Sequence, residues 1–207
     1  AQIQEPDTLL LAQTDPTQRP NMRPIVSVII PVYNAAPYLV ETLDSVLHST
    51  YRPIEVVMVD DGSRDDSATI AEQYCAAHPE YRLIRQSNAG VSAARNHAIR
   101  EATGKYILPV DADDKIGETY IEHAVQVLED QADVCVVGCK ARMCGDVEKE
   151  WKLPSFSHAL LARKNMIPVT SLFRKADWAR VGGFCEQDIY REDWDFWLSL
   201  LEQGGTF

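Results

Sequence analysis

The sequence predicts an α/β fold with a mostly parallel central sheet and helices on both faces, and three observations support it. Short apolar runs alternate with amphipathic stretches from Ile25 onward. The runs at 25–32 and 54–60 are nearly all apolar, as expected for strands that are covered on both faces. Strand and helix patterns follow one another in the order that requires right-handed parallel crossovers. Together they predict a doubly wound sheet.

The first half of the domain has the clearest pattern. Strands are expected at Ile25–Val32, Ile54–Asp60, Tyr81–Gln86 and Tyr106–Val110. The helix after the first strand has four apolar side chains at the spacing of one helical face, namely Leu39, Leu43, Val46 and Leu47. A helix of small residues follows the third strand, and we expect Gly104 to end it in the C′ position.

The second half is less regular. The next helix carries Ile121, Ala124, Val125 and Leu128 on one face and leads to a strand at Val134–Val137. A further strand is expected near Val169–Arg174, followed by a final helix from about Glu192. The buried face of that last helix is expected to carry Trp194, Trp197, Leu198 and Leu201.

The chain divides by composition into a tail and a domain. Residues 1–24 are rich in Gln, Pro, Thr and Asp without periodicity, which predicts a flexible tail or linker. Residues 25–207 are the right length for one α/β domain. The last residues, Gly204 to Phe207, resemble a turn that enters another element, so we expect the domain to be truncated at its C-terminus.

Charge and cysteine content narrow the class of partner. The formal net charge is −11, from 31 acidic and 20 basic residues. This balance argues against nucleic acid or an anionic membrane as the main partner, because both favour basic surfaces. Five irregularly spaced cysteines make a poor disulfide framework and favour a reducing compartment. With no stretch long enough to span a membrane and no secretory signal, we expect a cytoplasmic protein, with peripheral membrane contact left open.

Polar residues collect where the predicted strands end. In a doubly wound sheet the ligand lies beyond the carboxyl ends of the strands. The segments at those ends are Pro31-Val32-Tyr33-Asn34, Asp60-Asp61-Gly62-Ser63, Ser87-Asn88-Ala89-Gly90 and Asp111-Ala112-Asp113-Asp114. The sequence therefore predicts one polar and acidic rim.

The VDADD segment is the strongest candidate for a metal site. Asp111, Asp113 and Asp114 repel one another unless a cation compensates them, and Mg²⁺ or Mn²⁺ bound by carboxylates and substrate phosphates fits that need. The alternative is a solvated turn, since aspartate is common in turns. We expect Asp114 to cap the helix that follows.

Two further segments suit a nucleoside. Asp60 and Asp61 offer carboxylate acceptors for uracil N3–H or ribose hydroxyls. Pro31 stiffens a strand exit, and Tyr33 offers an aromatic face on which a base can stack. The alternatives are an ordinary turn with a helix cap and an ordinary rim tyrosine.

The last two segments concern phosphate and proton transfer. Gly90 permits close approach at a helix N-terminus, and Arg95 is a candidate diphosphate partner, with a surface ion pair as the alternative. Glu192 and Asp193 open the final helix, where the helix dipole favours acids in any protein. The functional interpretation makes one of them a general base.

Taken in order, these segments resemble the family-2 glycosyltransferases of the GT-A fold, a Rossmann-like α/β fold. The resemblance runs from about Val26 to Leu201 and rests on SVIIPVYNAAPYL, EVVMVDDGSRDDS, SNAGVSAARNHAI, GKYILPVDADD, GGF and EDWDFW. It implies an enzyme that moves a sugar from a nucleotide-diphosphate donor, a UDP-sugar above all, to an acceptor hydroxyl with inversion and with help from Mn²⁺ or Mg²⁺.

The resemblance also assigns roles. It implies a nucleotide-binding set of Pro31, Tyr33, Asn34, Asp60, Asp61, Asn88, Gly90, Arg95, Asp111 and Ala112. It implies metal contacts from Asp113 and Asp111, and a catalytic base at Asp193 with Glu192 beside it. Residues 25–115 would form the nucleotide-binding half and 116–207 the acceptor-side half, with a glycan, lipid-linked or other hydroxyl acceptor.

Three rival classes are weighed against this interpretation. A nucleotidyltransferase opens with a glycine-rich basic loop, which PVYNAAPYL is not. A phosphoacceptor receiver domain is shorter and needs a late lysine. A nucleotide-sugar-binding module would keep the binding segments and lose the base, whereas Glu192 and Asp193 are present.

Overall fold

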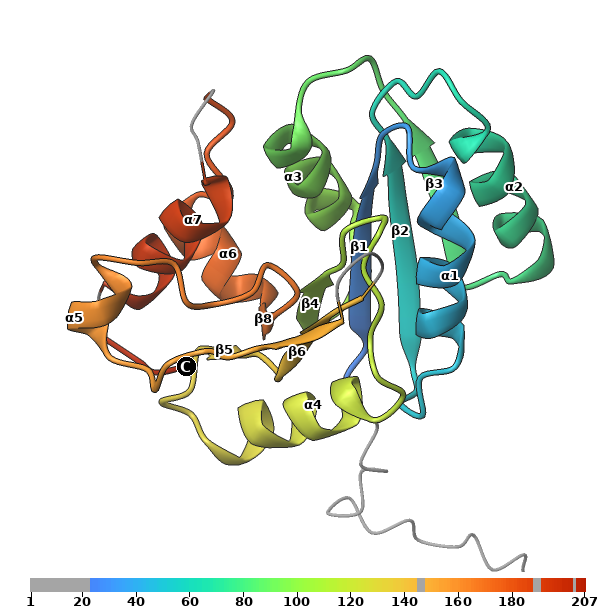
Figure 1. The fold of residues 1–207 in the computed structure, drawn as a ribbon. Coiled ribbons are helices and arrows are strands. Elements are labelled where there is room, and N and C mark those ends of the chain that lie inside the picture. Colours follow the sequence, from blue (N-terminus) through green and yellow to red (C-terminus); the bar gives the residue numbers. More distant parts are fainter. Residues whose placement is uncertain (1–22, 145–147, 188–190, 203) are drawn as a thin grey trace, which may run out of the picture.

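The computed structural model describes residues 23–144, 148–187, 191–202 and 204–207, and it shows a six-stranded mixed sheet between two layers of helices (Figure 1). The strand order is β3-β2-β1-β4-β8-β5. The strands of this sheet are β1 (Val26–Val32), β2 (Ile54–Asp60), β3 (Tyr81–Arg85), β4 (Tyr106–Pro109), β5 (Val136–Val137) and β8 (Leu172–Arg174). The α/β class and the mainly parallel sheet predicted from the sequence are confirmed.

Helices cover both faces of this sheet. They are α1 (Ala36–Leu47), α2 (Ser67–Ala77), α3 (Val91–Glu101), α4 (Tyr120–Asp130), α5 (His158–Leu161), α6 (Lys175–Val181) and α7 (Glu192–Leu201). Alternate residues of β1 face opposite layers, so Val28 and Ile30 pack in the cluster with α1, α2 and α4, while Ile29 packs in the cluster with α3 and α7. Burial on both faces explains why β1 and β2 appear in the sequence as continuous apolar runs.

The four strands β1 to β4 form the parallel part of the sheet. Val28 lies opposite Val56 on β2 and Leu108 on β4, so β1 has partners on both sides. Because these strands are parallel, their carboxyl ends meet at one edge. The segments after β1, β2 and β4 are therefore brought together there.

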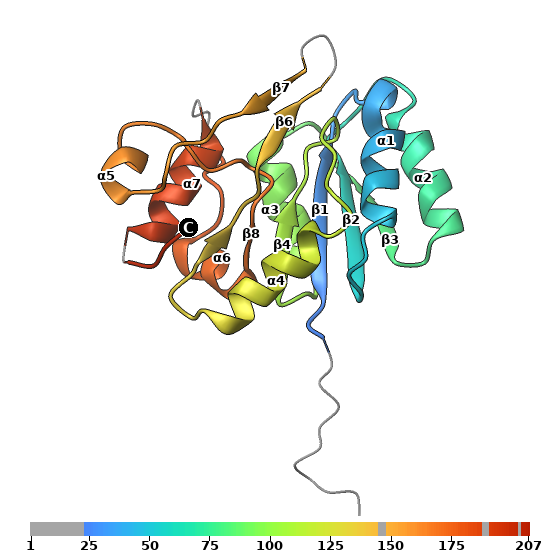
Figure 2. The same ribbon diagram turned by 60° about the horizontal axis from the view of Figure 1, so that its bottom comes forward.

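The C-terminal part departs from the expected order. The strand β8 is antiparallel and lies between β4 and β5, so β5 does not continue the parallel sheet. A separate two-stranded ribbon, β6 (Ala141–Met143) with β7 (Lys149–Trp151), was not expected from the sequence. Figure 2 shows this ribbon projecting from the side of α5 and α7 toward α1. The strands β6 and β7 are three residues long and almost fully exposed, so no apolar run marks them in the sequence.

The expected glycine cap of α3 is wrong. The helix ends at Glu101, and Ala102 in the C-cap position has extended backbone. Gly104 has an ordinary negative φ, and it is packed against the neighbouring strand: a Cβ there would lie 2.8 Å from the Ile25 carbonyl oxygen. The glycine is thus required by close packing and not by a left-handed turn.

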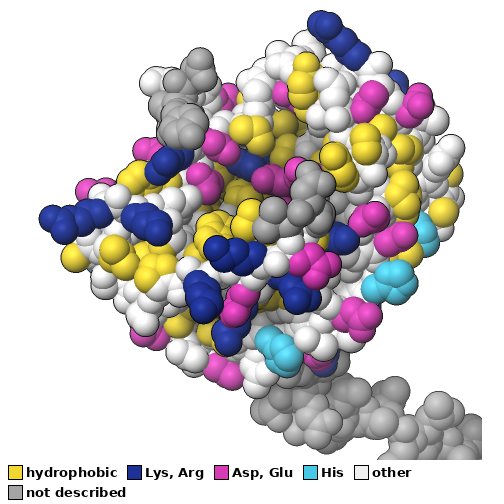
Figure 3. All heavy atoms as spheres, in the orientation of Figure 1, with side chains coloured by type: hydrophobic (Ala, Val, Ile, Leu, Met, Phe, Trp, Pro, Cys, Tyr) yellow, Lys and Arg dark blue, Asp and Glu magenta, His cyan; other side chains and the backbone are white. Residues whose placement is uncertain are grey.

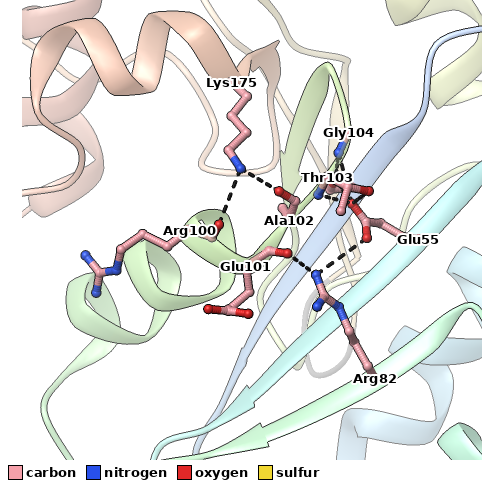
Figure 4. Close-up of polar contacts among 9 residues, drawn as sticks. Glu55, Arg82, Arg100, Glu101, Ala102, Thr103, Gly104 and Lys175 are labelled. Atoms are coloured by element: carbon pink, nitrogen blue, oxygen red, sulfur yellow. Dashed lines mark hydrogen bonds and ion pairs between the residues drawn. The ribbon is translucent and has the colours of Figure 1, made fainter.

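Charged side chains hold the end of α3 instead (Figure 4). Lys175 Nζ donates to the Ala102 carbonyl at 2.5 Å, and Arg82 donates to the last carbonyl of the helix. Glu55 accepts the Thr103 N–H, so the chain after the helix is also fixed. Cations favour this end of a helix because its free carbonyls carry partial negative charge. The opposite end of α3 is directed to the strand-end edge.

The final helix begins at Glu192 as expected, but its buried face is different. Phe196, Trp197, Leu200 and Leu201 are buried, whereas Trp194 and Leu198 are half-buried. Which side chains of a helix are buried depends on the neighbouring elements as well as on the sequence period. The helix α7 also packs against α6, on a second side. None of the described helices is long and apolar enough to cross a membrane.

Candidate active site

One open pocket of about 630 Å³ lies at the carboxyl edge of the parallel strands. Its walls come from the segments after β1, β2 and β4, from the start of α3 and from the start of α7. The predicted residues that line it are Pro31, Tyr33, Asn34, Asp61, Asn88, Gly90, Arg95, Asp111, Ala112, Asp113 and Glu192. Asp60 and Asp193 are not part of the lining. The pocket therefore gathers residues from the whole span between β1 and α7.

The two acids after β2 have different positions. Asp61 is buried, and its two carboxylate oxygens accept the backbone N–H groups of Ala89 at 2.8 Å and Gly90 at 2.9 Å. Asp60 is also buried and accepts the Ser63 N–H, which stabilises its own turn. Asp61 alone faces the pocket, so only that carboxylate can meet a ligand there without rearrangement.

Two tyrosines stand at the pocket mouth. Tyr33 follows β1 and is 50% exposed, and Tyr38 in the first turn of α1 is 57% exposed. Sequence reasoning missed Tyr38, although an aromatic residue so soon after a predicted strand end is a usable signal. Between them Asn34 takes a positive φ of 50°, and its side chain accepts the Arg64 N–H at 2.8 Å. This bond ties the turn after β1 to the turn after β2.

Arg95 connects the two acidic segments. Its guanidinium donates to Asp111 at 2.7 Å and to Glu192 at 2.6 Å, and its side chain is only 3% exposed. Burial lowers the pKa of Arg95, but the two carboxylates outweigh that effect and raise it, so the residue is a fixed positive charge. Arg95 thus forms ion pairs, as the alternative expected, but with a buried guanidinium and not at the surface. The buried Nε has no hydrogen-bond partner among the described residues.

The acids after β4 suit a divalent cation that is shared with a ligand. Asp113 is exposed and forms no hydrogen bond or ion pair with another described residue, so its carboxylate is available. Within the described ranges there is no cluster of three or more His, Cys, Asp or Glu that would enclose a metal. Mg²⁺ and Mn²⁺ sites that use one or two carboxylates and substrate phosphates have this form. The residues present fit such an ion.

The expected helix cap at Asp114 is wrong. The following helix, α4, begins only at Tyr120, and Thr119 holds the N-cap position. Asp114 instead closes the turn with Asp111 through its backbone N–H, and its carboxylate faces Thr170. Burial raises the pKa of Asp114, and the adjacent carboxylates add to the rise.

The acids of α7 are held by side chains. Glu192 faces the pocket and accepts from Arg95, whereas Asp193 accepts the Asn165 amide N–H at 2.7 Å. Burial raises the pKa of Asp193, against the lowering effect of the Asn165 hydrogen bond. A carboxyl group with a raised pKa binds protons more readily, which is a property of a general base.

Comparison with known proteins identifies the family. The model of glycosyl transferase family 2 matches residues 27–194, which is most of the chain. The chain belongs to glycosyl transferase family 2. The matched range runs from β1 to the start of α7 and includes every segment that lines the pocket.

Individual relatives agree with this family. The chain is 36% identical over 160 residues to an uncharacterized glycosyltransferase, YibD, of Escherichia coli, covering 76% of this chain and 43% of the relative. S. aureus TarS in complex with UDP is 25% identical, with a TM-score of 0.68, covering 83% of this chain and 53% of that one.

A mannosyltransferase of Pyrobaculum calidifontis, PcManGT, in complex with GDP-Man and Mn²⁺ is 26% identical. Its TM-score is 0.71, and the match covers 90% of this chain and 55% of that one. The chain thus spans less than half of YibD and about half of each solved structure. The GT-A-type fold expected from the sequence is confirmed by these neighbours.

Proposed function

We propose that this chain is the donor-binding and catalytic part of an inverting glycosyltransferase that uses a UDP-sugar and a divalent cation. The observation that carries the proposal is the pocket itself, which places Asp61, Asp113 and Glu192 around one open space beside two exposed tyrosines. In this proposal 25–115 is the nucleotide-binding half and 116–207 the acceptor-side half.

The nucleoside lies in the part of the pocket between β1 and β2. Tyr33 stacks on the base, because its ring is exposed at the pocket mouth. Asp61 accepts the uracil N3–H, and its position is fixed by the N–H groups of Ala89 and Gly90. A guanine base presents a different donor pattern, so the choice of base is a direct test of this arrangement.

The diphosphate lies between the start of α3 and the turn after β4. The N-terminus of α3 favours an anion through the N–H groups of its first turn, from Val91 onward, whereas the Gly90 N–H already donates to Asp61. Asp113, with Asp111 beside it, would hold the divalent cation, which when bound neutralises charge on the leaving diphosphate. Arg95 holds Asp111 in place and adds a fixed positive charge beneath the site.

Proton transfer is assigned to α7. Asp193 takes the proton of the acceptor hydroxyl while that oxygen attacks C1 of the donor sugar, and the bond from C1 to the diphosphate oxygen breaks on the opposite side. This single displacement inverts the configuration at C1. Glu192 accepts from Arg95 and orients the first turn of the helix.

Thermal unfolding with a panel of nucleotides tests the donor. UDP should raise the melting temperature more than GDP, ADP or CMP, and only with Mn²⁺ or Mg²⁺ present, because a ligand bound to the native state stabilises it by mass action. Equal or larger stabilisation by GDP overturns the uracil assignment and leaves the fold untouched. The anomeric configuration of the transferred sugar, read by NMR, decides between inversion and retention.

A further inference from the structure

Basic side chains without a partner are concentrated in one stretch of the chain. Most Lys and Arg residues form ion pairs or hydrogen bonds, as Arg85 does with Glu72 and Lys105 with Glu129. Among the described residues, the basic side chains that form no hydrogen bond or ion pair with another described residue are Arg64, Lys140, Arg142, Lys149, Lys152, Arg163 and Lys164. All but Arg64 lie between residues 140 and 164, in a protein with a net charge of −11.

These cations share one face of the molecule. They lie on or beside β6 and β7 and just after α5, and all of them are exposed. Figure 3 shows Lys and Arg side chains gathered over α5 and the β5–β6 part of this face. We call the six residues from Lys140 to Lys164 the basic strip. Because these cations form no ion pair with a described carboxylate, an anionic ligand would be stabilised here.

The basic strip contains a groove. A hollow of about 430 Å³ is lined by Lys140, Glu150, Trp151, Lys152 and Phe207, together with Gly138, Cys139 and Leu153. Trp151 is 46% exposed, so its ring forms an open wall of this groove. An exposed aromatic ring offers an apolar face to the C–H face of a sugar ring, and lysines on either side offer charge to its substituents.

The groove lies near the proposed active site. The β6–β7 ribbon that carries it extends toward α1, whose first turn bears Tyr38 in the pocket lining (Figure 2). An extended molecule in the groove therefore runs along β6 and β7 toward the acidic pocket. The groove carries exposed lysines, whereas the pocket is lined by several acids, so the two places suit two different ligands of one reaction.

We propose that this groove binds an anionic glycan chain, with carboxylate or phosphate groups in its repeats, and that this chain is the acceptor. That last step rests on the proposed function, whereas binding of the glycan does not. A concave groove with Glu150 inside it suits a chain molecule better than a flat membrane surface. The net charge of −11 also disfavours an anionic membrane.

Binding of defined oligosaccharides tests the proposal. A hyaluronan oligosaccharide carries carboxylates, a poly(glycerol phosphate) oligomer carries phosphates, and a maltooligosaccharide of equal length is neutral. Calorimetric titration should show binding of one or both anionic probes, weakened by added salt, and much weaker binding of the neutral probe. Comparison of the two anionic probes shows whether the groove prefers carboxylate or phosphate groups.

Matched variants locate the site. The double variant Lys140→Gln/Lys152→Gln should lose about tenfold in affinity for the anionic probe, as expected for two exposed ion pairs. Arg85→Gln/Lys105→Gln removes the same charge from other faces and should retain affinity. Trp151→Ala keeps the charge and should also weaken binding, while circular dichroism confirms that each variant is folded.

Three results would overturn the proposal. They are equal binding of neutral and anionic probes, equal losses in the two double variants, and binding to phosphatidylglycerol vesicles without binding to either anionic oligosaccharide. UDP affinity with Mn²⁺ is measured on the same samples. If UDP does not bind while the anionic probe does, the proposed use of a UDP-sugar is wrong, whereas the proposed binding of an anionic glycan in the groove is retained.

Discussion

The two walls of the pocket are built in different ways. On the strand-end wall, Asp61 is held mainly by the backbone N–H groups of Ala89 and Gly90, just before α3, with the Gln86 side-chain amide as a third donor. On the α7 wall, Glu192 is held by the Arg95 side chain, and Asp193, which follows it outside the pocket lining, is held by the Asn165 side chain. Backbone contacts survive most substitutions of their residues, whereas side-chain contacts disappear when the partner is changed.

This difference separates the two tasks of the site. The strand-end wall is fixed by buried parallel strands, so it offers a constant shape for the proposed nucleotide. The α7 wall follows short strands and helices, and its acids depend on side-chain partners. We therefore expect substitutions on the first wall to change nucleotide binding and those on the second to change turnover.

The largest effect is expected on the α7 wall. Asp193→Asn keeps size and hydrogen bonding but removes basicity, so turnover should fall by about 10²–10⁴-fold with UDP affinity unchanged. Release of UDP from the donor and calorimetric binding of UDP measure the two properties.

Glu192→Gln is the matched comparison for Asp193→Asn. If Glu192→Gln is inactive and Asp193→Asn is active, the base is Glu192. If both variants turn over normally, neither acid is the base, and the acids serve only the helix dipole.

The next effect belongs to the strand-end wall. Asp113→Ala should reduce cation-dependent UDP affinity by at least about 100-fold, more than the loss from an outer-shell change, because ion and diphosphate are held together. Titration of UDP with and without Mn²⁺ gives the value. Asp114→Ala, which removes a carboxylate from the same turn, should have a much smaller effect. Similar losses in both variants would mean that Asp113 is not the ligand.

The strand-end wall is also the part that the sequence predicts best. The bounds of β2 agree with the expected Ile54–Asp60, because a strand buried on both faces is a continuous apolar run with a polar residue at its end. Once the strands are placed, parallel pairing brings Asp61 and Asp113 to one edge without further information. The local sequence pattern and the sheet topology are therefore enough to predict the strand-end wall.

The α7 wall depends on contacts that no local pattern reveals. Arg95 pairs with Asp111 and with Glu192, which is 97 residues away in the chain, so its burial depends on how α7 packs. The strand expected near Val169–Arg174 is present as β8, but its position between β4 and β5 was missed, because strand order depends on long-range pairing and not on local pattern. The roles assigned to the pocket residues remain predictions.

Arg95 contacts acids on both walls, so its substitution should affect the properties assigned to each of them. Arg95→Met leaves Asp111 and Glu192 without their shared partner, and stability should fall by about 1.5–3 kcal/mol, the cost of losing hydrogen bonds to charged groups. UDP affinity and turnover should both decline. Arg100→Met, which breaks an exposed pair with Glu186, should change stability by less than about 1 kcal/mol. A loss of turnover alone would show that Arg95 serves only α7.

The smallest effect concerns the pH dependence that the α7 wall imposes. A base works only when ionised, so turnover should fall as the pH drops through the pKa of Asp193. Burial raises that pKa, so the acid limb of the profile should lie above the ordinary range for aspartate, near 3.9. Asn165 donates to the ionised form and opposes the rise. Asn165→Asp keeps an oxygen for the Ile167 N–H but replaces the donor with a second acid.

The acid limb of Asn165→Asp should therefore move to higher pH, while turnover on the plateau above it stays close to that of the parent protein. The raised pKa also sets how the stability of the fold depends on pH. Protonated Asp193 is favoured in the folded state, so the stability that this group contributes is present at low pH and is lost as the pH rises through its folded pKa. Thr170→Ala is the control variant. It removes the hydrogen bond from Thr170 to Asp114 and should leave the acid limb in place. Profiles of turnover against pH for the three proteins decide the matter. A uniform loss at every pH, without movement of the limb, would mean that the group titrating in turnover is not Asp193.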